Sequence, residues 1–376
     1  MIDKILLFPY YLTLKVRHSL YNKGIKKVVP SPIPTVCIGN IAVGGTGKTP
    51  HTEMVLRTLL QDEQWKDKSI AVLSRGYKRR SKGFQQVLTN DGASFSGDEP
   101  AQIKKNFPGV TVAVCKNRNE GLRYLAEPDK FRAMKKARKC AHRDFPAAQV
   151  AVLDDSFQYR ALKPTLSIVL ADYKRPISED ALMPIGRLRD LPERIAAADV
   201  LIVTKCPSYI ETWEKINWLK VSGIKNYNPE TFTGTYLGKE LKIYFTYVDY
   251  QPLETVYHYS NEKRYNYSSR AIVFTGIAKD GPMLRYLGDS FKVLRHFKFR
   301  DHKRFTRFDM RKVAAASISN PTAAIITTEK DSVRVTDCRY VPKEIKERLF
   351  YLPIKVFFTN DKEEAHFRST LLSAIK

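Results

Sequence analysis

Cysteine is scarce in this sequence, and none of it forms a C-x-x-C pair. The 5 cysteines are scattered along the chain: Cys37, Cys115, Cys140, Cys206 and Cys338. An odd number of cysteines without such spacing does not favour a disulfide framework or a zinc site. The pattern is typical of reduced thiols in a cytoplasmic protein.

The apolar run near the N-terminus is too short to cross a membrane. It reads ILLFPYYLTL over residues 5–14, whereas a spanning helix needs about 20 apolar residues. A signal peptide would place its basic residues first and end in small residues, but here Lys15, Arg17 and Lys23 follow the run. Two readings stay open: residues 1–30 form a membrane-associating amphipathic helix, or this helix packs on its own domain.

Acidic residues are also few relative to basic ones. The chain has 39 Asp and Glu against 64 Lys and Arg, a net charge of +25. This excess indicates a polyanionic partner, which is nucleic acid, an acidic membrane surface or a phosphorylated substrate. Repeats and low-complexity tracts are absent, and 43% hydrophobic with 27% charged residues is the composition of a folded protein.

Six nearly continuous apolar runs alternate with helical patterns in the first part of the chain. We expect strands within residues 35–41, 69–77, 110–115, 149–155, 166–173 and 199–206. We expect helices within residues 49–61, 98–107, 117–127 and 192–198. Strands of this kind are buried on both faces, as in a parallel sheet flanked by helices. The pattern predicts an α/β fold with a doubly wound, mostly parallel sheet.

The composition changes near residue 240, where tyrosine-rich and polar sequence replaces the alternation. Further strands are expected within residues 270–278, 323–331 and 351–358. We therefore place a larger domain at residues 31–240 and a smaller C-terminal α/β domain at residues 241–376.

The segment TVCIGNIAVGGTGKTP, residues 35–50, carries the strongest chemical signal. It puts a glycine-rich turn between a buried strand and a helix, as in a P-loop NTPase. The turn amides of Gly44, Gly45, Thr46 and Gly47 are expected to bind phosphate oxygens. Lys48 would reach the β and γ phosphates of ATP, and the Thr49 hydroxyl would bind Mg²⁺. One departure from G-x-x-x-x-G-K-[ST] is Ala42, where the pattern has glycine.

Two acidic positions fit a nucleotide enzyme. The strand within residues 149–155 ends in Asp154 and Asp155, where a P-loop enzyme holds its metal. In SGDEP, residues 96–100, Asp98 and Glu99 begin a helix close to where a phosphate acceptor would lie. That second pattern fits an ordinary helix N-terminus equally well.

Seven motifs in order make the sequence recognisable. They are GNIAVGGTGKTP (39–50), SRGY (74–77), SGDEP (96–100), LDDSFQYR (153–160), PIGRLRD (184–190), RDHKRFT (300–306) and TTEKDSVR (327–334). Together they resemble the tetraacyldisaccharide 4'-kinases of lipid A biosynthesis, from the N-terminal segment to about residue 334. The resemblance implies transfer of the γ-phosphate of ATP to the 4'-hydroxyl of a tetraacyl glucosamine disaccharide 1-phosphate. It also implies work at the cytoplasmic face of the bacterial inner membrane.

The resemblance implies roles for single residues. Asp98 matches the general base and His302 the histidine paired with it, so closure of two domains would assemble this pair. The remaining matches are metal positions at Thr49, Asp154 and Asp155, and the family's Arg-Glu pair near the phosphates at Arg189 and Asp190, of which Asp190 is a further candidate metal ligand. Asp190 is shorter than the family's glutamate, and Tyr159, where many members have histidine, is given no catalytic role.

Two other functions remain open from the residues alone. A P-loop kinase or ligase with a soluble substrate would share the glycine-rich loop and the acidic strand end. A nucleic-acid-binding ATPase would use the basic charge, but the sequence contains no helix-turn-helix, zinc-finger or RNP-type signature, and no nucleic acid partner is expected. The cationic loop around His302, with Lys303, Arg304 and Arg307, suits a phosphorylated substrate.

Overall fold

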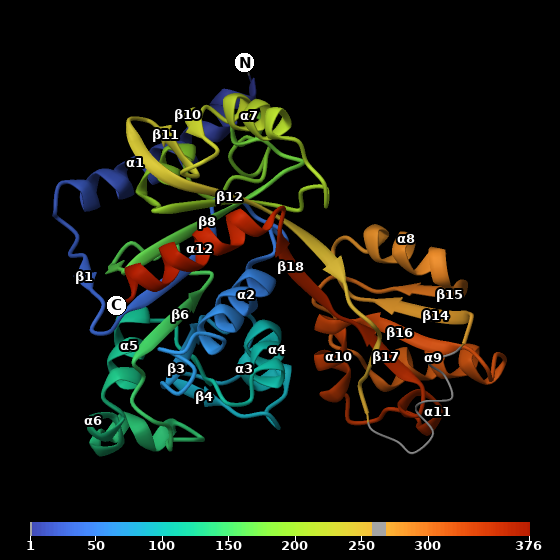
Figure 1. Ribbon diagram of the computed structural model, residues 1–376. Helices are drawn as coiled ribbons and strands as arrows, with labels where there is room; N and C mark the ends of the chain where they lie inside the picture. The colour runs from blue at the N-terminus through green and yellow to red at the C-terminus, as the bar shows by residue number, and fades with distance from the viewer. Residues whose placement is uncertain (1, 258–267) are drawn as a thin grey trace.

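The computed structural model describes residues 2–257 and 268–376. Part of the tyrosine-rich stretch, residues 258–267, lies outside the described residues. Figure 1 shows a larger unit and a smaller one, each built around a sheet and joined by strands β12 and β18.

The larger unit contains an 11-stranded sheet. In spatial order its strands are β10 (Lys225–Asn228), β11 (Thr233–Tyr236), β12 (Lys239–Tyr250), β9 (Val200–Thr204), β8 (Leu166–Asp172), β2 (Thr35–Asn40), β6 (Val150–Asp154), β3 (Ile70–Ser74), β5 (Thr111–Val114) and β4 (Gln85–Val87), with β18 (Ile354–Phe358) paired to β12. The pairs from β12 to β5 are parallel, and the edge pairs are antiparallel. The doubly wound, mostly parallel sheet expected from the sequence is therefore confirmed.

Helices cover both faces of this sheet. They are α1 (Ile2–Asn22), α2 (Lys48–Leu60), α3 (Ala93–Ser96), α4 (Asp98–Asn106), α5 (Arg118–Ala126), α6 (Pro128–Ala133), α7 (Thr212–Val221) and α12 (Asp361–Ala374), with 3₁₀ turns at Lys135–Lys139, Ile177–Glu179 and Pro192–Ala197. The helix expected at residues 192–198 is thus a short 3₁₀ turn. A two-stranded parallel sheet, β1 (Val29–Pro30) with β7 (Leu162–Lys163), follows α1.

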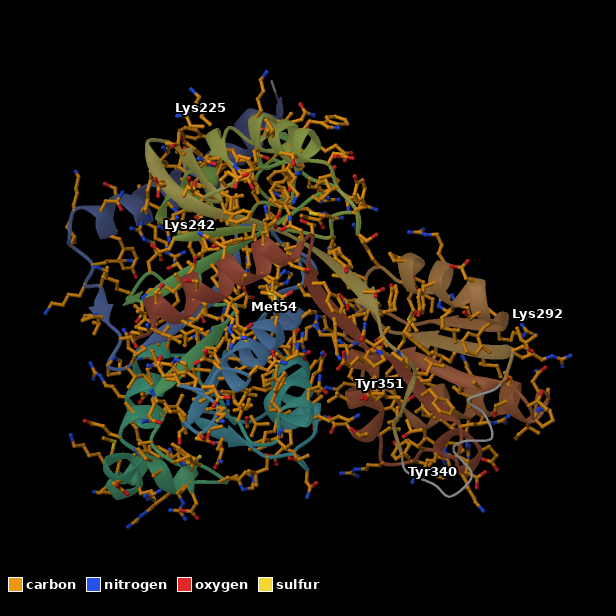
Figure 2. The ribbon with its side chains drawn as sticks, viewed as in Figure 1. Met54, Lys225, Lys242, Lys292, Tyr340 and Tyr351 are labelled. Atoms are coloured by element: carbon orange, nitrogen blue, oxygen red, sulfur yellow. The ribbon has the colours of Figure 1, made fainter. Side chains whose placement is uncertain are left out.

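Alternate residues of β2 enter different cores. Ile38 packs in a core with Met54 of α2 and Phe367 of α12, whereas Cys37 belongs to the core that contains Leu14 of α1. Figure 2 labels Met54 on α2, beneath α12. A strand buried on both faces explains why the sequence reads as an unbroken apolar run.

The smaller unit contains a 5-stranded sheet. Its strands in order are β13 (Glu254–Thr255), β17 (Leu349–Leu352), β16 (Ala324–Thr328), β14 (Arg270–Thr275) and β15 (Lys292–Lys298). Its helices are α8 (Gly281–Ser290), α9 (Arg307–Ile318), α10 (Glu329–Thr336) and α11 (Lys343–Lys346). The strand expected at residues 323–331 ends at Thr328, and α10 follows directly.

The chain does not stay in the smaller unit. The boundary expected at residue 240 falls at the start of β12, which pairs with β9 through residues 242–245 and then with β18 through residues 246–250. Phe367, Leu371 and Ile375 then pack in the core of the larger sheet. The division at residue 240 stays a prediction, and this packing favours assigning residues 354–376 to the larger unit.

Candidate active site

The glycine-rich loop leaves the middle strand β2 and ends at the first turn of α2. Gly44 and Gly47 have φ angles of 113° and 86°, a region that residues with a Cβ atom rarely adopt. Ala42 has a negative φ and forms a bridge with Leu188. The departure from the glycine pattern at residue 42 therefore causes no backbone strain.

Side chains from outside the loop bind three successive loop carbonyls. Lys205 donates to the Gly45 oxygen, Thr204 Oγ1 donates to the Thr46 oxygen at 3.1 Å, and His51 Nδ1 lies 2.7 Å from the Gly47 oxygen. Burial lowers the pKa of His51 to about 4, so the ring is neutral and its Nδ1–H donates. The Thr46 amide donates to the Gly44 oxygen at 2.9 Å, whereas the amides of Gly44, Gly45 and Gly47 have no partner among the described residues and remain for phosphate oxygens.

Lys48 lies beside the acids that end β6. Its Nζ is 3.9 Å from Asp155 Oδ1, and burial lowers the pKa of Lys48. Burial, together with the charges of Asp155 and Glu99, raises the pKa of Asp154 to about 6. The register Ile38 opposite Asp154 puts the ends of β2 and β6 side by side, as the sequence predicted.

Mg²⁺ fits these acids. Asp154 is 3% exposed, and within the described part of the chain its carboxylate accepts only from Thr52 and Ser74, each 3.4 Å away, so this buried group lacks a strong partner. A divalent cation would supply that partner and keep the group ionised. The described residues hold no cluster of three or more His, Cys, Asp and Glu that could bind a metal alone. Mg²⁺ in nucleotide sites needs only one or two carboxylates besides the phosphates.

Arg189 joins this group through its side chain. It forms an ion pair with both oxygens of Asp155 and donates to Asn40 Oδ1 at 2.7 Å. Burial raises the pKa of Asp155, but the charges of Lys48 and Arg189 outweigh it and hold the pKa below its usual value. Asp155 therefore stays ionised next to the loop.

The side chain of Asp190 points away from the phosphate loop and toward helix α1. Its Oδ1 lies 2.6 Å from His18 Nε2 of α1 and accepts from the Leu191 amide at 2.9 Å, and the residue is 1% exposed. The side chain of Arg189 contacts Asp155, whereas that of its neighbour Asp190 contacts His18, so the two side chains diverge. The expectation that Asp190 ligates the metal gains no support from this arrangement.

Asp98 is the first residue of α4, and Gly97 before it has a φ of 99°. A Cβ on Gly97 would lie 3.1 Å from the Tyr77 carbonyl, so SRGY and SGDEP touch through their backbones. Gly97 is the N-cap residue, and no side chain caps the helix. The Asp98 carboxylate is thus not used as a cap.

That carboxylate reaches the smaller unit. His302 Nδ1 is 2.8 Å from Asp98 Oδ2, and Arg334 Nε and Nη2 donate to the same oxygen at 2.9 and 2.6 Å. Burial would raise the pKa of Asp98, but the hydrogen bonds from His302 and Arg334 hold it well below its usual range. The backbone of His302, with φ 57°, is held by a bond from its amide to the Gly276 oxygen at 3.1 Å.

More contacts between α4 and α10 keep the two units together. Lys330 donates to Glu99 at 2.5 Å, and Asn106 Nδ2 donates to Glu329 Oε1 at 2.6 Å and to Glu53 Oε1 at 3.1 Å. Burial raises the pKa of Glu53 to about 8, with the charge of Glu329 as the second cause. These contacts hold Asp98 of the larger unit next to His302 of the smaller one.

Several site residues escaped the sequence prediction. Arg334 lies within TTEKDSVR, so the motif was found but its arginine was given no role. Thr204 is the last residue of β9 and Lys205 follows it, a position at which parallel sheets gather ligand-binding residues. Tyr159, whose hydroxyl donates to Asn117 Oδ1 at 2.9 Å, remains without a proposed role.

Comparisons with known proteins identify the family of this chain. The family model described as tetraacyldisaccharide-1-P 4'-kinase matches residues 4–376. The tetraacyldisaccharide 4'-kinase of Phocaeicola vulgatus is 35% identical over 96% of this chain and 91% of its own length. That of Flavobacterium johnsoniae is 33% identical over 99% and 97%. A crystal structure of LpxK from Aquifex aeolicus in complex with ATP superposes with a TM-score of 0.66 at 25% identity, covering 100% of this chain and 99% of that one. The phosphate loop, the acids beside it and these matches together show that the chain belongs to the tetraacyldisaccharide 4'-kinase family.

Proposed function

We propose that Asp98 and His302 form the acceptor side of an ATP-dependent kinase that phosphorylates the 4'-hydroxyl of a tetraacyl glucosamine disaccharide 1-phosphate. The reaction belongs to lipid A biosynthesis and uses ATP with Mg²⁺. The observation that carries the assignment of residues is the contact between Asp98 and His302, 2.8 Å apart. The family favours this reaction over the soluble-substrate and nucleic-acid alternatives.

Asp98 has one oxygen to offer the substrate. Oδ2 already accepts three hydrogen bonds, and Oδ1 has no partner among the described residues. A sugar hydroxyl that donates to Oδ1 would be oriented toward the γ-phosphate and would pass its proton to this carboxylate. A low pKa does not prevent this, because a loose transition state places little charge on the attacking oxygen.

The loop side holds the nucleotide. Lys48 neutralises charge on the transferring phosphoryl group, and Arg189 contributes a second cation held by Asp155. Thr49, Asp154 and Asp155 are the residues that would hold Mg²⁺, which would neutralise charge on the phosphates. The amides of Gly44, Gly45 and Gly47 supply backbone donors to the phosphates.

The enzyme meets its lipid substrate, on this proposal, at the cytoplasmic face of the inner membrane. Among the described residues, no helix is long and apolar enough to span a bilayer. In α1, Leu14 and His18 are buried, whereas Phe8, Leu12 and Val16 are 58%, 47% and 51% exposed. One face of α1 thus packs on the larger unit, and the opposite, apolar face supports the proposal that this helix also lies on a membrane, next to Lys23, Lys26 and Lys27.

The experiment that tests the reaction uses labelled ATP and a purified tetraacyl disaccharide 1-phosphate in detergent micelles. We expect a bisphosphorylated lipid that depends on both ATP and Mg²⁺. A matched acceptor that lacks the 4'-hydroxyl serves as the control. Label transfer to the control acceptor at the same rate would show that the assignment of the 4' position is wrong.

A further inference from the structure

Three residues of α1 face the larger unit at helical spacing. Tyr10, Leu14 and His18 are four residues apart and share one side of the helix. Leu14 is 5% exposed and belongs to the core that contains Cys37 of the central strand. The neighbouring Tyr11 is exposed and takes no part in this contact.

The polar side chains on this face, Tyr10 and His18, bind two adjacent residues of the candidate site. Tyr10 donates its hydroxyl to the Arg189 carbonyl oxygen at 2.8 Å. His18 Nε2 lies 2.6 Å from Asp190 Oδ1. Arg160 Nη1 donates to His18 Nδ1 at 2.8 Å, so Nδ1 is the acceptor and Nε2 carries the proton given to Asp190.

The side chain of Arg189 continues the connection to the phosphate loop. It donates to Asn40 Oδ1 at 2.7 Å and pairs with Asp155, which lies 3.9 Å from Lys48. A second connection runs in parallel, because Arg17 donates to the Gln158 carbonyl at 2.8 Å and Gln158 donates to the Asn40 carbonyl. Two routes thus join α1 to residues that border the ATP site.

We propose that Tyr10 and His18 are positioning residues for phosphoryl transfer: they hold the backbone of residues 189–190 so that the Arg189 guanidinium lies beside Asp155. This inference rests on the proposed role of Arg189. Helix α1, which carries the exposed apolar face, would then also support the Arg189 guanidinium in the candidate active site.

A purely structural role would predict something different. In that case loss of the Tyr10 hydroxyl would lower the melting temperature and leave the kinetics of the folded enzyme unchanged. A positioning role instead lowers kcat at saturating ATP and acceptor, because misplacement of a catalytic cation is felt in the transition state.

The experiment compares Tyr10→Phe with Tyr11→Phe in the full chain, with the labelled-ATP assay on mixed micelles. We expect kcat of Tyr10→Phe to fall about threefold to tenfold, as one hydrogen bond predicts. Tyr11→Phe, the same change one residue further along the helix, should behave like the parent. Both variants should bind phosphatidylglycerol vesicles like the parent. An equal fall in both variants, or a fall that follows the loss of vesicle binding, overturns the proposal.

The double variant with Arg189→Ala identifies the route. If Tyr10 acts through Arg189, Tyr10→Phe has no further effect on kcat in the Arg189→Ala background, and additive losses overturn the proposal. An unchanged kcat in Arg189→Ala alone would instead show that the proposed role of Arg189 is wrong. A large loss in Arg189→Ala with none in Tyr10→Phe rejects only the role of Tyr10.

His18 provides an independent check. In His18→Gln the amide nitrogen takes the position of Nε2 and still donates to Asp190, whereas His18→Leu keeps bulk without a donor. We expect Gln to retain more of the parent kcat than Leu at equal melting temperature. Equal kcat values in the two variants contradict a positioning role for His18.

Discussion

Nδ1 of His302 lies 2.8 Å from Oδ2 of Asp98, although the two residues are 204 positions apart and belong to different units. Arg334 binds the same oxygen and also donates to the Gly276 oxygen at 2.7 Å. The carboxylate of the larger unit is therefore oriented by two groups of the smaller one. Any opening of the units removes both groups at once.

Replacement of Asp98 by asparagine tests its role in turnover. Asp98→Asn keeps the shape of the side chain but cannot take a proton, so we expect kcat to fall by about 10²- to 10⁴-fold. The KM for ATP should stay close to that of the parent, since Asp98 lies on the acceptor side. Steady-state assays with labelled ATP measure both constants.

Asp301→Asn is the matched control for Asp98. Asp301 is 45% exposed and its carboxylate lies 4.0 Å from His302 Nε2. We expect this variant to change kcat little. Near-normal turnover of Asp98→Asn would mean that the base lies elsewhere and that Asp98 only joins the units.

Removal of the Lys205 ammonium group tests the bonds that hold the phosphate loop. Lys205 donates to the Gly45 carbonyl and to Asp172 at 2.8 Å. A hydrogen bond from a charged donor contributes about 1.5–3 kcal/mol, so Lys205→Met should weaken ATP binding about 10- to 100-fold. Titration of the variant with ATP by calorimetry measures the effect. Lys220→Met, an exposed lysine of α7, is the control, and equal affinities of the two variants would contradict the prediction.

The buried Glu53 makes stability depend on pH. Because its pKa is raised to about 8, the folded state keeps a proton that the unfolded state, with a pKa of about 4.3, has lost. Stability should therefore fall as the pH rises from about 4.3 to about 8. Glu53→Gln still accepts from Asn106 but does not titrate, so its curve should be flatter in that window. Urea denaturation across this range measures the slopes.

Glu63→Gln controls for surface charge, since the Glu63 side chain is 87% exposed. This variant should keep the slope of the parent. If the stability of Glu53→Gln depends on pH as steeply as that of the parent, the dependence does not arise from a raised pKa of Glu53 beside Glu329.

Serine at three exposed positions of α1 tests the contact with a membrane. The triple variant Phe8→Ser, Leu12→Ser and Val16→Ser removes the apolar surface without altering Tyr10 or His18. We expect sedimentation with phosphatidylglycerol vesicles to fall sharply, because membrane binding of such helices scales with buried apolar area. Phe308→Ser on α9, 73% exposed, is the control. Unchanged vesicle binding of the triple variant would exclude α1 as the membrane contact.

Most of the phosphate side was predictable from the sequence. The strand, the glycine turn, Lys48 and the acids at the end of β6 depend on residues close together in the chain and on the shared edge of parallel strands. Strands β2 and β6 were also predictable, because both are buried and their sequences read as apolar runs. The direction of Asp190 was not predictable, because its partner His18 is 172 positions away.

The sequence by itself determined the α/β class, the nucleotide loop and, through seven ordered motifs, the family. Each of these depends on local backbone preferences and on short-range spacing. Only the tertiary structure decided that Arg334, 236 positions from Asp98, donates to the Asp98 carboxylate. It also decided that residues 361–374 return to the larger sheet and that α1 reaches Arg189. These contacts arise from the packing of whole elements, and no local pattern in the chain encodes which distant side chain will fill a given position.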